Sequence, residues 1–575
     1  MVKWLSWWWW LSAGLVVLNL SLAPIPGTET DIWWHLAAGR RFWQHGLELT
    51  DPYSFTEPNH PWIRIDWLFQ VLLYPVYQRG GLPALMLLRS ACLLGGAALV
   101  AFVLRRRAPA ESWLLIMLVA SIWAHSIALR PAALSLFFTT LWTSLLELGR
   151  LEKHRALWAL PPLMWLWFNL HVASLAGILL LGLYAVGHTL ERLRAAQKPD
   201  WLWWKILGLS FLATFVNPQG WKTVFYPIHF MLVKSPWRDL ISEVQPPHWN
   251  TPGTWQARLL LGLALVGGAR AFSKRQVTPL LVTLVIGFLM NQATRHQYQL
   301  CVTLVPWAAL SLPRPLRAIT AGAALLFTVH AAMALLVLRF PLSGLVRRES
   351  FSERLAALTA QGPHGLRVFV DMNAAGYFLY HFDGRQKVFI DSRTDQVYLQ
   401  PGLLPDHQEI WTGGERALQL LDQYQIQAVV NNRLDSDGSP LWSKLKVSAD
   451  WTCVSSDLIG ELYVRNELVQ DFPDLPQPAY LRDFLNGFSL EAEGRLGEAE
   501  ASWLNSLKDY PQYASAYQWL GKLWTAQGKR AQARRALARA EAYHAENSGL
   551  DEDWRRLGIH WPRWLRAYFL PFWAL

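Results

Sequence analysis

The chain has 575 residues, a hydrophobic content of 52%, 34 tryptophans and a formal net charge of +11. This length allows more than one domain, and the apolar content exceeds that of ordinary soluble proteins, so we expect a membrane protein with a soluble part. The basic residues cluster between apolar runs, a pattern of membrane topology that argues against nucleic acid as a partner. Three widely spaced cysteines, Cys92, Cys301 and Cys453, indicate neither a disulfide framework nor a metal cluster.

Eleven apolar runs before residue 340 predict membrane-spanning helices. With a cytoplasmic N-terminus and one crossing per run, every inner loop is basic, as the positive-inside rule requires. This pattern holds only if residues 156–187 form a hairpin that turns at 169–171 rather than one tilted span. The first run lacks a small-residue cleavage site and is expected to stay uncleaved. The runs lie at 5–23, 83–104, 112–129, 132–149, 157–170, 172–187, 201–216, 254–268, 276–291, 298–312 and 318–339.

The same topology places nearly all the unusual polar residues on the outer side of the membrane. A site at the outer surface would explain this one-sidedness, and so would a soluble domain that leans on that face. The expected outer segments are residues 24–82, Arg130, residues 169–171, 217–253 and 293–297, and everything beyond about residue 340.

Beyond residue 340 the composition is that of a globular protein. Helical segments at 373–382, 413–424 and 439–446 alternate with short strand-like segments, which predicts an α/β domain over residues 341–470. Asp391, Arg393 and Asp395 follow one of the strands, and a salt bridge that fixes a loop is favoured over a ligand site. The strand-like segments are "LRVFVDM", "KVFIDSR", "IQAVVNN" and "GELYVRN".

Residues 471–550 contain an internal repeat of 34 residues. Small residues at that period, where paired helices cross, are typical of tetratricopeptide repeats, so we expect two helical hairpins that offer a surface to a protein partner. The last segment, residues 551–575, mixes Trp, Phe and Arg without spanning length and is expected to be an interfacial or docking helix. The residues related by the repeat are Gly487 and Gly521, Gly494 and Gly528, Ala499 and Ala533, and Ser506 and Ala540.

The stretch "DIWWHLAAGRRFWQHG" places an acid, a histidine and several aromatic residues just beyond the first apolar run. Asp31 and His35 are one helical turn apart on one face. In the ordinary interpretation Asp31 is an N-cap and the aromatic residues anchor the helix at the membrane interface. The same loop supplies Asp51, which is also suited to a turn, and Asp66, which is also suited to a cap. Carboxyls beside a membrane have raised pKa values unless they are paired, and a raised pKa suits a general base.

These residues carry a resemblance to a known family. "DIWWHLAAGRRFWQHG", "TDPYSFT" and "WIRIDWLFQVLLY" are similar to the first outer loop of bacterial membrane proteins related to the GT-C glycosyltransferases, which include the oligosaccharyltransferases. The similarity continues through "VNPQGW", "ISEVQPPHW", "ATRHQYQL" and "AAGYFLYHFDGRQKVFIDSRTDQVY" and covers most of residues 1–465. It implies a GT-C-like transmembrane domain over residues 1–340 in a bacterial cytoplasmic membrane, with the C-terminal domains outside the cytoplasm.

The resemblance also implies a chemistry, namely transfer of a sugar from a polyprenyl-phosphate or polyprenyl-diphosphate carrier. The first-loop acid of the family acts as a base or a metal ligand, and Asp31 matches it. A later outer-loop acid often helps to bind the acceptor, and Glu243 is the nearest match, with a surface salt bridge as its ordinary interpretation. The second outer loop holds little more than Arg130 and Pro131, so the acid pair of the oligosaccharyltransferases is missing, as is their WWDYG motif.

These departures argue against a bound Mg²⁺ or Mn²⁺, which needs converging carboxylates; Asp31 and Asp51 are the first candidates if one is bound. Arg295 stands at the outer end of a membrane helix, where a guanidinium can clamp a lipid-linked phosphate in two places at once. His296 beside it and Lys222 are further candidates for binding the donor phosphate. Interfacial arginines also extend to lipid headgroups, which is the ordinary interpretation of Arg295.

The sequence therefore supports three functions. The first is an integral-membrane glycosyltransferase that uses a polyprenyl-phosphate-type donor and a lipid, glycan or protein acceptor, with Asp31, Asp51 and Glu243 as catalytic residues and His35 and Asp66 in support. The second is a non-catalytic membrane scaffold that recruits envelope or polysaccharide assembly partners through its tetratricopeptide units. The third is a transporter of lipid-linked glycans, against which the small number of charges inside the apolar runs argues.

Overall fold

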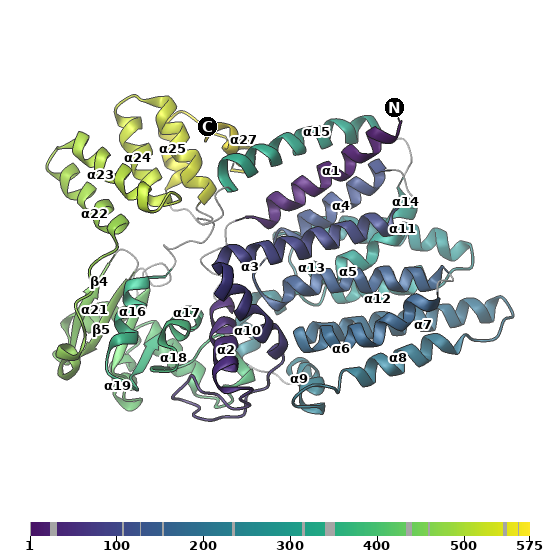
Figure 1. Cartoon of the computed structure of the whole chain (residues 1–575), viewed down its shortest axis with the longest axis horizontal. Coiled ribbons are helices and arrows are strands. Elements are labelled where there is room, and N and C mark those ends of the chain that lie inside the picture. The colour runs from purple at the N-terminus through teal and green to yellow at the C-terminus, as the bar shows by residue number, and fades with distance from the viewer. Residues whose placement is uncertain are drawn as a thin grey trace.

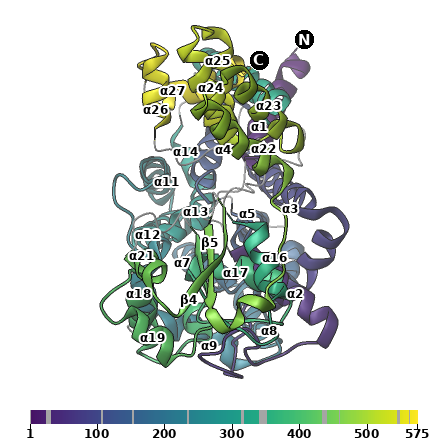
Figure 2. The same cartoon turned by 90° about the vertical axis from the view of Figure 1, so that its left-hand side faces the viewer.

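In the computed structural model, long helices form a bundle, and two smaller parts lie side by side beyond one end of it (Figures 1 and 2). One of these parts is an α/β domain and the other consists of helices only. The residues that the structure describes are 2–23, 31–105, 109–126, 128–151, 154–232, 236–312, 317–339, 351–432, 440–457, 460–543, 549–561 and 563–574. The side chain of Asp395 lies outside this description.

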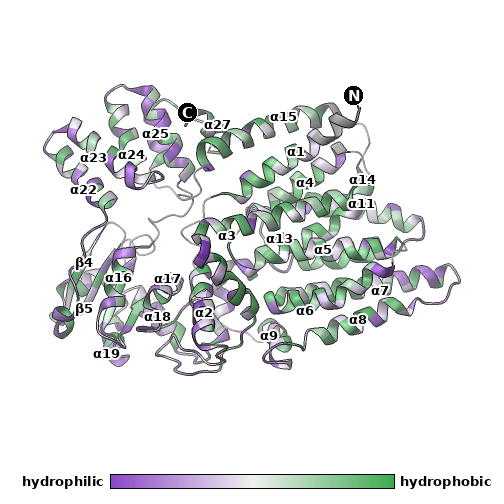
Figure 3. Cartoon of the chain, in the orientation of Figure 1, coloured by the Kyte–Doolittle hydropathy of each residue, from purple (hydrophilic) through white to green (hydrophobic). Residues whose placement is uncertain are grey.

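The apolar runs fold into the helices of the bundle, and Figure 3 shows apolar residues along most of their length. Among the described residues, four helical segments are long and apolar enough to cross a membrane, namely Trp67–Val103, Pro131–Arg150, Val172–Arg194 and Ile319–Arg339. Other apolar helices are shorter, so the count of eleven crossings stays a prediction. The bundle consists of α1 (Val2–Ser21), α3 (Trp67–Val103), α4 (Pro109–Trp123), α5 (Pro131–Arg150), α6 (Leu160–Leu170), α7 (Leu175–Arg194), α8 (Trp201–Ala213), α11 (Thr254–Ser273), α12 (Thr278–Met290), α13 (Thr294–Leu300), α14 (Val305–Ser311) and α15 (Arg317–Ala334).

Residues 156–187 form two helices rather than one. The helix stops at His171, whose backbone is extended at φ −165° and ψ 124°. A Cβ atom on Gly177 of α7 would lie 2.8 Å from Trp167 and 3.2 Å from Met164, both on α6. Such contacts between residues ten and thirteen positions apart require α7 to fold back on α6, because a continuous helix would separate them by about 15 Å or more.

A buried arginine fixes the place where the chain leaves α1. Arg89 of α3 is 2% exposed, and its guanidinium donates to the carbonyl oxygens of Ser21 at 2.5 Å and Ala23 at 2.8 Å. The last carbonyls of a helix have no partner within the helix, and a cation beside them is favoured by the helix dipole. The outer loop that carries Asp31 therefore starts from an anchored point.

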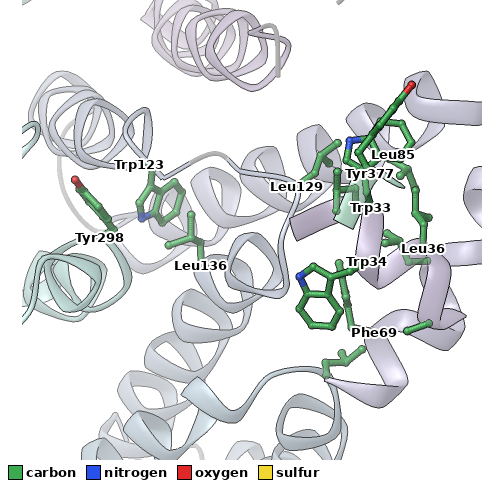
Figure 4. Packing of buried hydrophobic residues seen from close by; sticks show 14 of the residues in the cluster. Trp33, Trp34, Leu36, Phe69, Leu85, Trp123, Leu129, Leu136, Tyr298 and Tyr377 are labelled. Atoms are coloured by element: carbon green, nitrogen blue, oxygen red, sulfur yellow. The ribbon is translucent and has the colours of Figure 1, made fainter. Parts of the chain in front are cut away.

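The first half of helix α2 (Asp31–His45) packs inside the protein, with residues 32–39 buried. Trp33 and Trp34 are buried, and the ring of Trp33 contacts that of Tyr377 with centroids 4.9 Å apart. Figure 4 shows these tryptophans and Leu36 among residues of neighbouring elements. The prediction that the aromatic residues anchor the helix at the lipid surface is wrong for Trp33 and Trp34, because α3 on one side and the α/β domain on the other cover this face. Trp43 is 59% exposed, and for it the anchoring role stays a prediction.

The α/β domain contains a five-stranded sheet in the order β2-β1-β3-β5-β4. Strands β2, β1 and β3 are parallel, and β3, β5 and β4 are antiparallel. The four segments expected to be strands contain β1, β2, β3 and β5; the edge strand β4 is an addition. The strands are β1 (Arg367–Val370), β2 (Lys387–Val388), β3 (Ala428–Asn432), β4 (Trp451–Ser456) and β5 (Gly460–Arg465), and the helices are α16 (Glu353–Gln361), α17 (Met372–Phe382), α18 (Leu403–Trp411), α19 (Ala417–Gln423) and α21 (Pro440–Val447).

The first outer loop joins the α/β domain through its backbone. The amide of Val388 in β2 donates to the carbonyl of Tyr53 at 3.0 Å, and the amide of Phe55 donates to the carbonyl of Val388 at 3.2 Å. Ser54 and Val388 thus form a parallel bridge. Edge strands expose unpaired backbone groups, and here the outer loop satisfies those of β2.

The side chain of Arg393 closes the same junction. It is fully buried and donates to Asp51 at 2.7 Å and to Asp391 at 2.8 and 2.6 Å. The guanidinium also lies 4.5 Å from the ring centroid of Trp62. Burial lowers the pKa of Arg393, but Asp391 and Asp51 raise it well above its usual value. The predicted salt bridge is therefore present, and it links the loop to the domain.

The C-terminal part consists of two helical hairpins followed by two further helices. A Cβ atom on Gly487 would lie 2.2 Å from Trp503, and one on Gly521 would lie 2.6 Å from Leu537, so equivalent glycines of the repeat sit where paired helices cross. That these hairpins are tetratricopeptide units stays a prediction. The helices are α22 (Ala479–Ala492), α23 (Leu496–Asp509), α24 (Ala514–Ala526), α25 (Arg530–Tyr543), α26 (Leu550–Arg556) and α27 (Arg563–Trp573).

The final helix α27 packs against other helices of the same chain, α25 and α15. Leu570 packs in one cluster with Leu537 of α25 and with Leu338, which follows α15. Helix α27 thereby connects the hairpins to the bundle.

Replacing Arg393 by Met should destabilise the protein by roughly 3–5 kcal/mol, because two carboxylates would be left buried without their cation. Thermal unfolding in detergent measures this loss. Exposed Arg416 provides the control, since Arg416→Met should change stability by about 0.5 kcal/mol or less. Equal melting temperatures for Arg393→Met and the wild type would contradict the assigned role.

Candidate active site

Two acids from segments far apart in the sequence meet at the guanidinium of Arg130. Its Nε lies 3.4 Å from Oδ2 of Asp31, and its Nη1 lies 3.6 Å from Oε2 of Glu243. Asp31 begins α2, Arg130 directly precedes α5, and Glu243 lies in a short 3₁₀ turn, Ser242–Val244. The structure therefore brings together two of the three acids that the sequence singled out.

The other carboxylate oxygen of Asp31 is held by two donors. Ser392 of the α/β domain donates to Oδ1 at 2.8 Å, and the indole of Trp34 donates to the same oxygen at 3.3 Å. Burial raises the pKa of Asp31, but Arg130, His35 and these two donors together lower it by more, so the net change is downward. The expectation of a raised pKa at this acid is wrong, because Asp31 is paired. Asp31 is therefore ionised at neutral pH. Its side chain is 24% exposed, so a ligand can reach it.

His35 lies behind Asp31 as a neutral ring. It is 2% exposed, it stacks on Trp34 with ring centroids 3.7 Å apart, and its Nδ1 is 3.4 Å from Nε2 of Gln70. Phe69 meets it edge-on at 5.1 Å. Burial lowers the pKa of His35 to about 3, although Asp31 acts in the opposite direction. Asp31 and His35 thus lie one turn apart on α2, but the neutral ring carries no charge that could pair with the carboxylate.

Asp66 is a second acid of the same loop, in the opposite protonation state. It is 6% exposed, and its Oδ1 has no hydrogen-bond partner among the described residues. Burial and the nearby charge of Asp31 raise the pKa of Asp66 to about 8, although Arg64 lowers it. Two carboxyls whose environments separate their pKa values can serve as base and acid in one site.

Arg295 approaches the same place from α13. Burial lowers the pKa of Arg295, while the charge of Glu243 raises it, so the two groups lie within electrostatic reach. The structure gives Arg295 no hydrogen bond or ion pair with any described residue. His171 is also close, since burial and then Arg295 lower its pKa to about 3, and its Nδ1 lies 2.7 Å from Oγ of Ser135.

Of the remaining predicted site residues, Asp51 and His296 have hydrogen-bond partners of their own, and Lys222 is exposed. Asp51 is fully buried in the contact with Arg393 and accepts from the amides of Tyr53 and Ser54 at 3.1 and 3.0 Å, which leaves it no route to a substrate. Nδ1 of His296 lies 3.1 Å from the carbonyl oxygen of Leu289. Lys222 is exposed at the start of α9 (Trp221–Leu232).

The sequence did not single out Arg130 or Ser392 as functional. In the sequence, Arg130 is only the charged residue of a very short predicted loop, which indicates no function. Ser392 had no signal, because an isolated serine after a strand is common and its partner is 361 residues away.

The donors at this site do not fit a divalent cation. Mg²⁺ and Mn²⁺ need several converging oxygen ligands, and no group of three His, Cys, Asp or Glu side chains among the described residues is placed to hold a metal. Asp31 and Glu243 converge, but the guanidinium of Arg130 lies between them. Asp51 is occupied by Arg393.

Comparison with known proteins finds structural neighbours only. No family model and no curated protein matches the chain. The chain is similar to the apo oligosaccharyltransferase of Archaeoglobus fulgidus, with a TM-score of 0.48, 11% identity, and coverage of 74% of this chain and 70% of that one. It is also similar to AglB from the same organism, in complex with an inhibitory peptide and a dolichol-phosphate. Here the TM-score is 0.49 and the identity 9%, and the match covers 82% of this chain and 76% of that one. A third neighbour is ArnT from Cupriavidus metallidurans, bound to undecaprenyl phosphate. Its TM-score is 0.45 and its identity 15%, and the match covers 83% of this chain and 100% of that one.

These neighbours are GT-C glycosyltransferases, the class that the sequence resembles. With TM-scores below 0.5 and identities of 9–15%, the likeness by itself carries neither an activity nor a substrate over to this chain.

Replacing Asp66 by Asn should raise the melting temperature by an amount that grows with pH. The folded chain binds the proton of Asp66 more tightly than the unfolded chain, whose carboxyl has the usual pKa of 3.8, against about 8 when folded. The stability from this proton is therefore full below about pH 4 and is lost as the pH rises to about 8. Melting temperatures of both proteins from pH 4 to 9 measure the difference, with exposed Asp239→Asn as the control. A difference independent of pH would refute the raised pKa.

Proposed function

We propose that this chain is an integral-membrane glycosyltransferase that moves a sugar or glycan from a polyprenyl-phosphate-type donor to an acceptor outside the cytoplasm. The observation that carries the proposal is the convergence of Asp31, Arg130, Glu243 and Arg295, from four separate segments, at one end of an apolar helix bundle. Acids suited to acceptor chemistry thus lie beside cations suited to a phosphate.

Asp31 is the proposed base. Its ionised carboxylate accepts the proton of an acceptor hydroxyl while the hydroxyl oxygen attacks the anomeric carbon of the sugar. The bond between that carbon and the phosphate oxygen breaks, and its electron pair leaves with the phosphate. A donor diester of one negative charge thereby becomes a polyprenyl phosphate of two, and Asp31 becomes neutral, so the charges balance.

Arg295 is the proposed contact for the leaving phosphate. Its guanidinium makes no hydrogen bond or ion pair with another described residue, and burial strengthens its attraction for an anion. Two parallel N–H donors match two phosphate oxygens, which an ammonium group cannot do. Glu243, within electrostatic reach of Arg295, is the proposed acceptor contact.

The donor class follows from the GT-C resemblance of the sequence. Among the neighbours, AglB is in complex with a dolichol-phosphate and ArnT is bound to undecaprenyl phosphate, and lipids of this kind are the proposed carriers here. Membrane lipids are the expected surroundings of the four long apolar helices.

The proposed setting is a bacterial cytoplasmic membrane with the α/β domain outside. The last turn of α7 carries Arg192 and Arg194, and the turn that follows carries Lys198; both lie at the end of the bundle away from the α/β domain (Figure 1). Basic loops stay in the cytoplasm. This supports an outward position for the candidate site.

Asp31→Asn should lower the rate of transfer by about 10²–10⁴-fold, because the base is lost while the size of the side chain is kept. Release of polyprenyl phosphate from a short-chain prenyl-phosphate-linked sugar measures the rate in purified protein. Asp239→Asn, an exposed acid on α10 (Pro236–Leu240), is the matched control and should retain the wild-type rate. Undiminished transfer by Asp31→Asn would remove Asp31 from the mechanism.

One observation favours the scaffold function as a second candidate. A cavity of about 450 Å³ lies between α23, α24 and α25, with Leu504, Leu520 and Trp524 among its apolar lining residues. Lys508 and Arg535 add positive charge to this lining. A groove of this kind suits an acidic segment of a partner protein.

Complementation of a deletion strain separates the two candidates. If the chain acts as an enzyme, Asp31→Asn should fail to restore envelope integrity, while Arg535→Glu should restore it at least partly. The scaffold function predicts the reverse, since charge reversal in the groove weakens binding of an acidic partner and Asp31 is not needed. Immunoblotting of membranes shows that both variants are present at equal levels.

A further inference from the structure

We infer that Arg130 occupies, in this chain, the place of a divalent cation between the two acids, so that transfer is independent of metal ions. This inference rests on the proposed function and gives Arg130 the role of a positioning residue for Asp31 and Glu243. Nothing in the first outer loop alone would indicate it, since Arg130 comes from the next outer turn.

The geometry gives Arg130 a bridging position. Its Nε faces Asp31 at 3.4 Å and its Nη1 faces Glu243 at 3.6 Å, so one planar group spans both carboxylates. The residue is extended, at φ −121° and ψ 166°, directly before Pro131 at the start of α5. A residue before proline is restricted to extended conformations, which limits the positions open to its side chain.

The charges explain why a metal ion would be excluded. Asp31 and Glu243 each carry one negative charge, and Arg130 and Arg295 each carry one positive charge, so the four groups are balanced without a metal. A divalent cation on Oδ2 of Asp31 and Oε2 of Glu243 would meet the guanidinium that already faces both oxygens. Like charges at such distances disfavour one another, and the arginine cannot lose its proton.

Arg130 also keeps Asp31 ionised, the form that can accept a proton. Burial raises the pKa of Asp31. Of the groups that lower this pKa, Arg130 has the largest effect, ahead of His35, Ser392 and Trp34. Asp66 also faces this acid, as the influence of Asp31 on its pKa shows. Loss of Arg130 would therefore make Asp31 harder to ionise and leave Glu243 without the same anchor.

The first test measures metal binding directly. Electron paramagnetic resonance of Mn²⁺ titrated into the wild-type protein should show no bound ion that depends on Asp31, and EDTA should change the rate of transfer by less than twofold. One Mn²⁺ per chain that is lost in Asp31→Asn, or loss of transfer in EDTA, would overturn the inference. If no donor supports transfer and no such Mn²⁺ is bound, the proposed function fails while the exclusion of metal is supported.

The second test separates positioning from folding. Arg130→Met should lower transfer at least tenfold and should shift the acidic limb of the pH profile to higher pH, because Asp31 loses its cation. Arg130→Lys restores the charge and should move the limb back, with a partial recovery of rate. An unshifted limb in a folded Arg130→Met protein would contradict the role. If Arg130→Met does not fold, the test rests on Arg130→Lys, which should transfer more slowly than the wild type and bind no Mn²⁺. Metal-dependent transfer by Arg130→Lys would overturn the inference.

Discussion

The buried guanidinium of Arg393 is the contact on which the arrangement of the outer face depends. It joins Asp391 of the α/β domain to Asp51 of the first loop, which lies 342 residues before Arg393 in the sequence. Removing one partner of a buried charge network is costly, whereas the intact network allows essentially one arrangement of its members. Ser392 is the neighbour of Arg393 in the chain, so fixing the arginine also fixes the hydroxyl that donates to Asp31. The domain is thus part of the candidate site.

Burial and charge then divide the roles of the loop acids. Asp31 has donors and a guanidinium on its two oxygens and is ionised, whereas Asp66 is buried beside that negative charge and holds its proton. Asp51, the third acid, is committed to structure by Arg393. Similar carboxyls a few tens of residues apart are therefore ionised, protonated and ion-paired, and only their surroundings distinguish them.

The sequence predicted much of the local structure because that structure follows from local patterns. The strands around Val368, Val388, Val429 and Tyr463, the turn at His171 and the helical repeat all lie where apolar periodicity and small residues indicated. Strand β4 was missed because its burial alternates only weakly at the edge of the sheet.

The site was predicted only in part, since its contacts join residues that are distant in sequence. Asp31, Glu243 and Arg295, which the predicted topology placed on one side, lie near one another, while the count of eleven crossings and the orientation stay predictions. It could not show that Asp51 pairs with Arg393, or that Trp33 of α2 is covered by the α/β domain rather than by lipid. It also could not show that Arg130 spans two acids.

The central claim is that the outer cluster of Asp31, Arg130, Glu243 and Arg295 is where a lipid-linked phosphate is handled. The most direct measurement is a cryo-electron microscopy structure of the protein with a polyprenyl phosphate added in excess. The account predicts density for the phosphate within hydrogen-bond distance of Arg295, with the prenyl chain leading away into the membrane and Arg130 still between the two acids. A phosphate bound only at the opposite end of the bundle, near Arg150, with Arg295 unchanged, would contradict it.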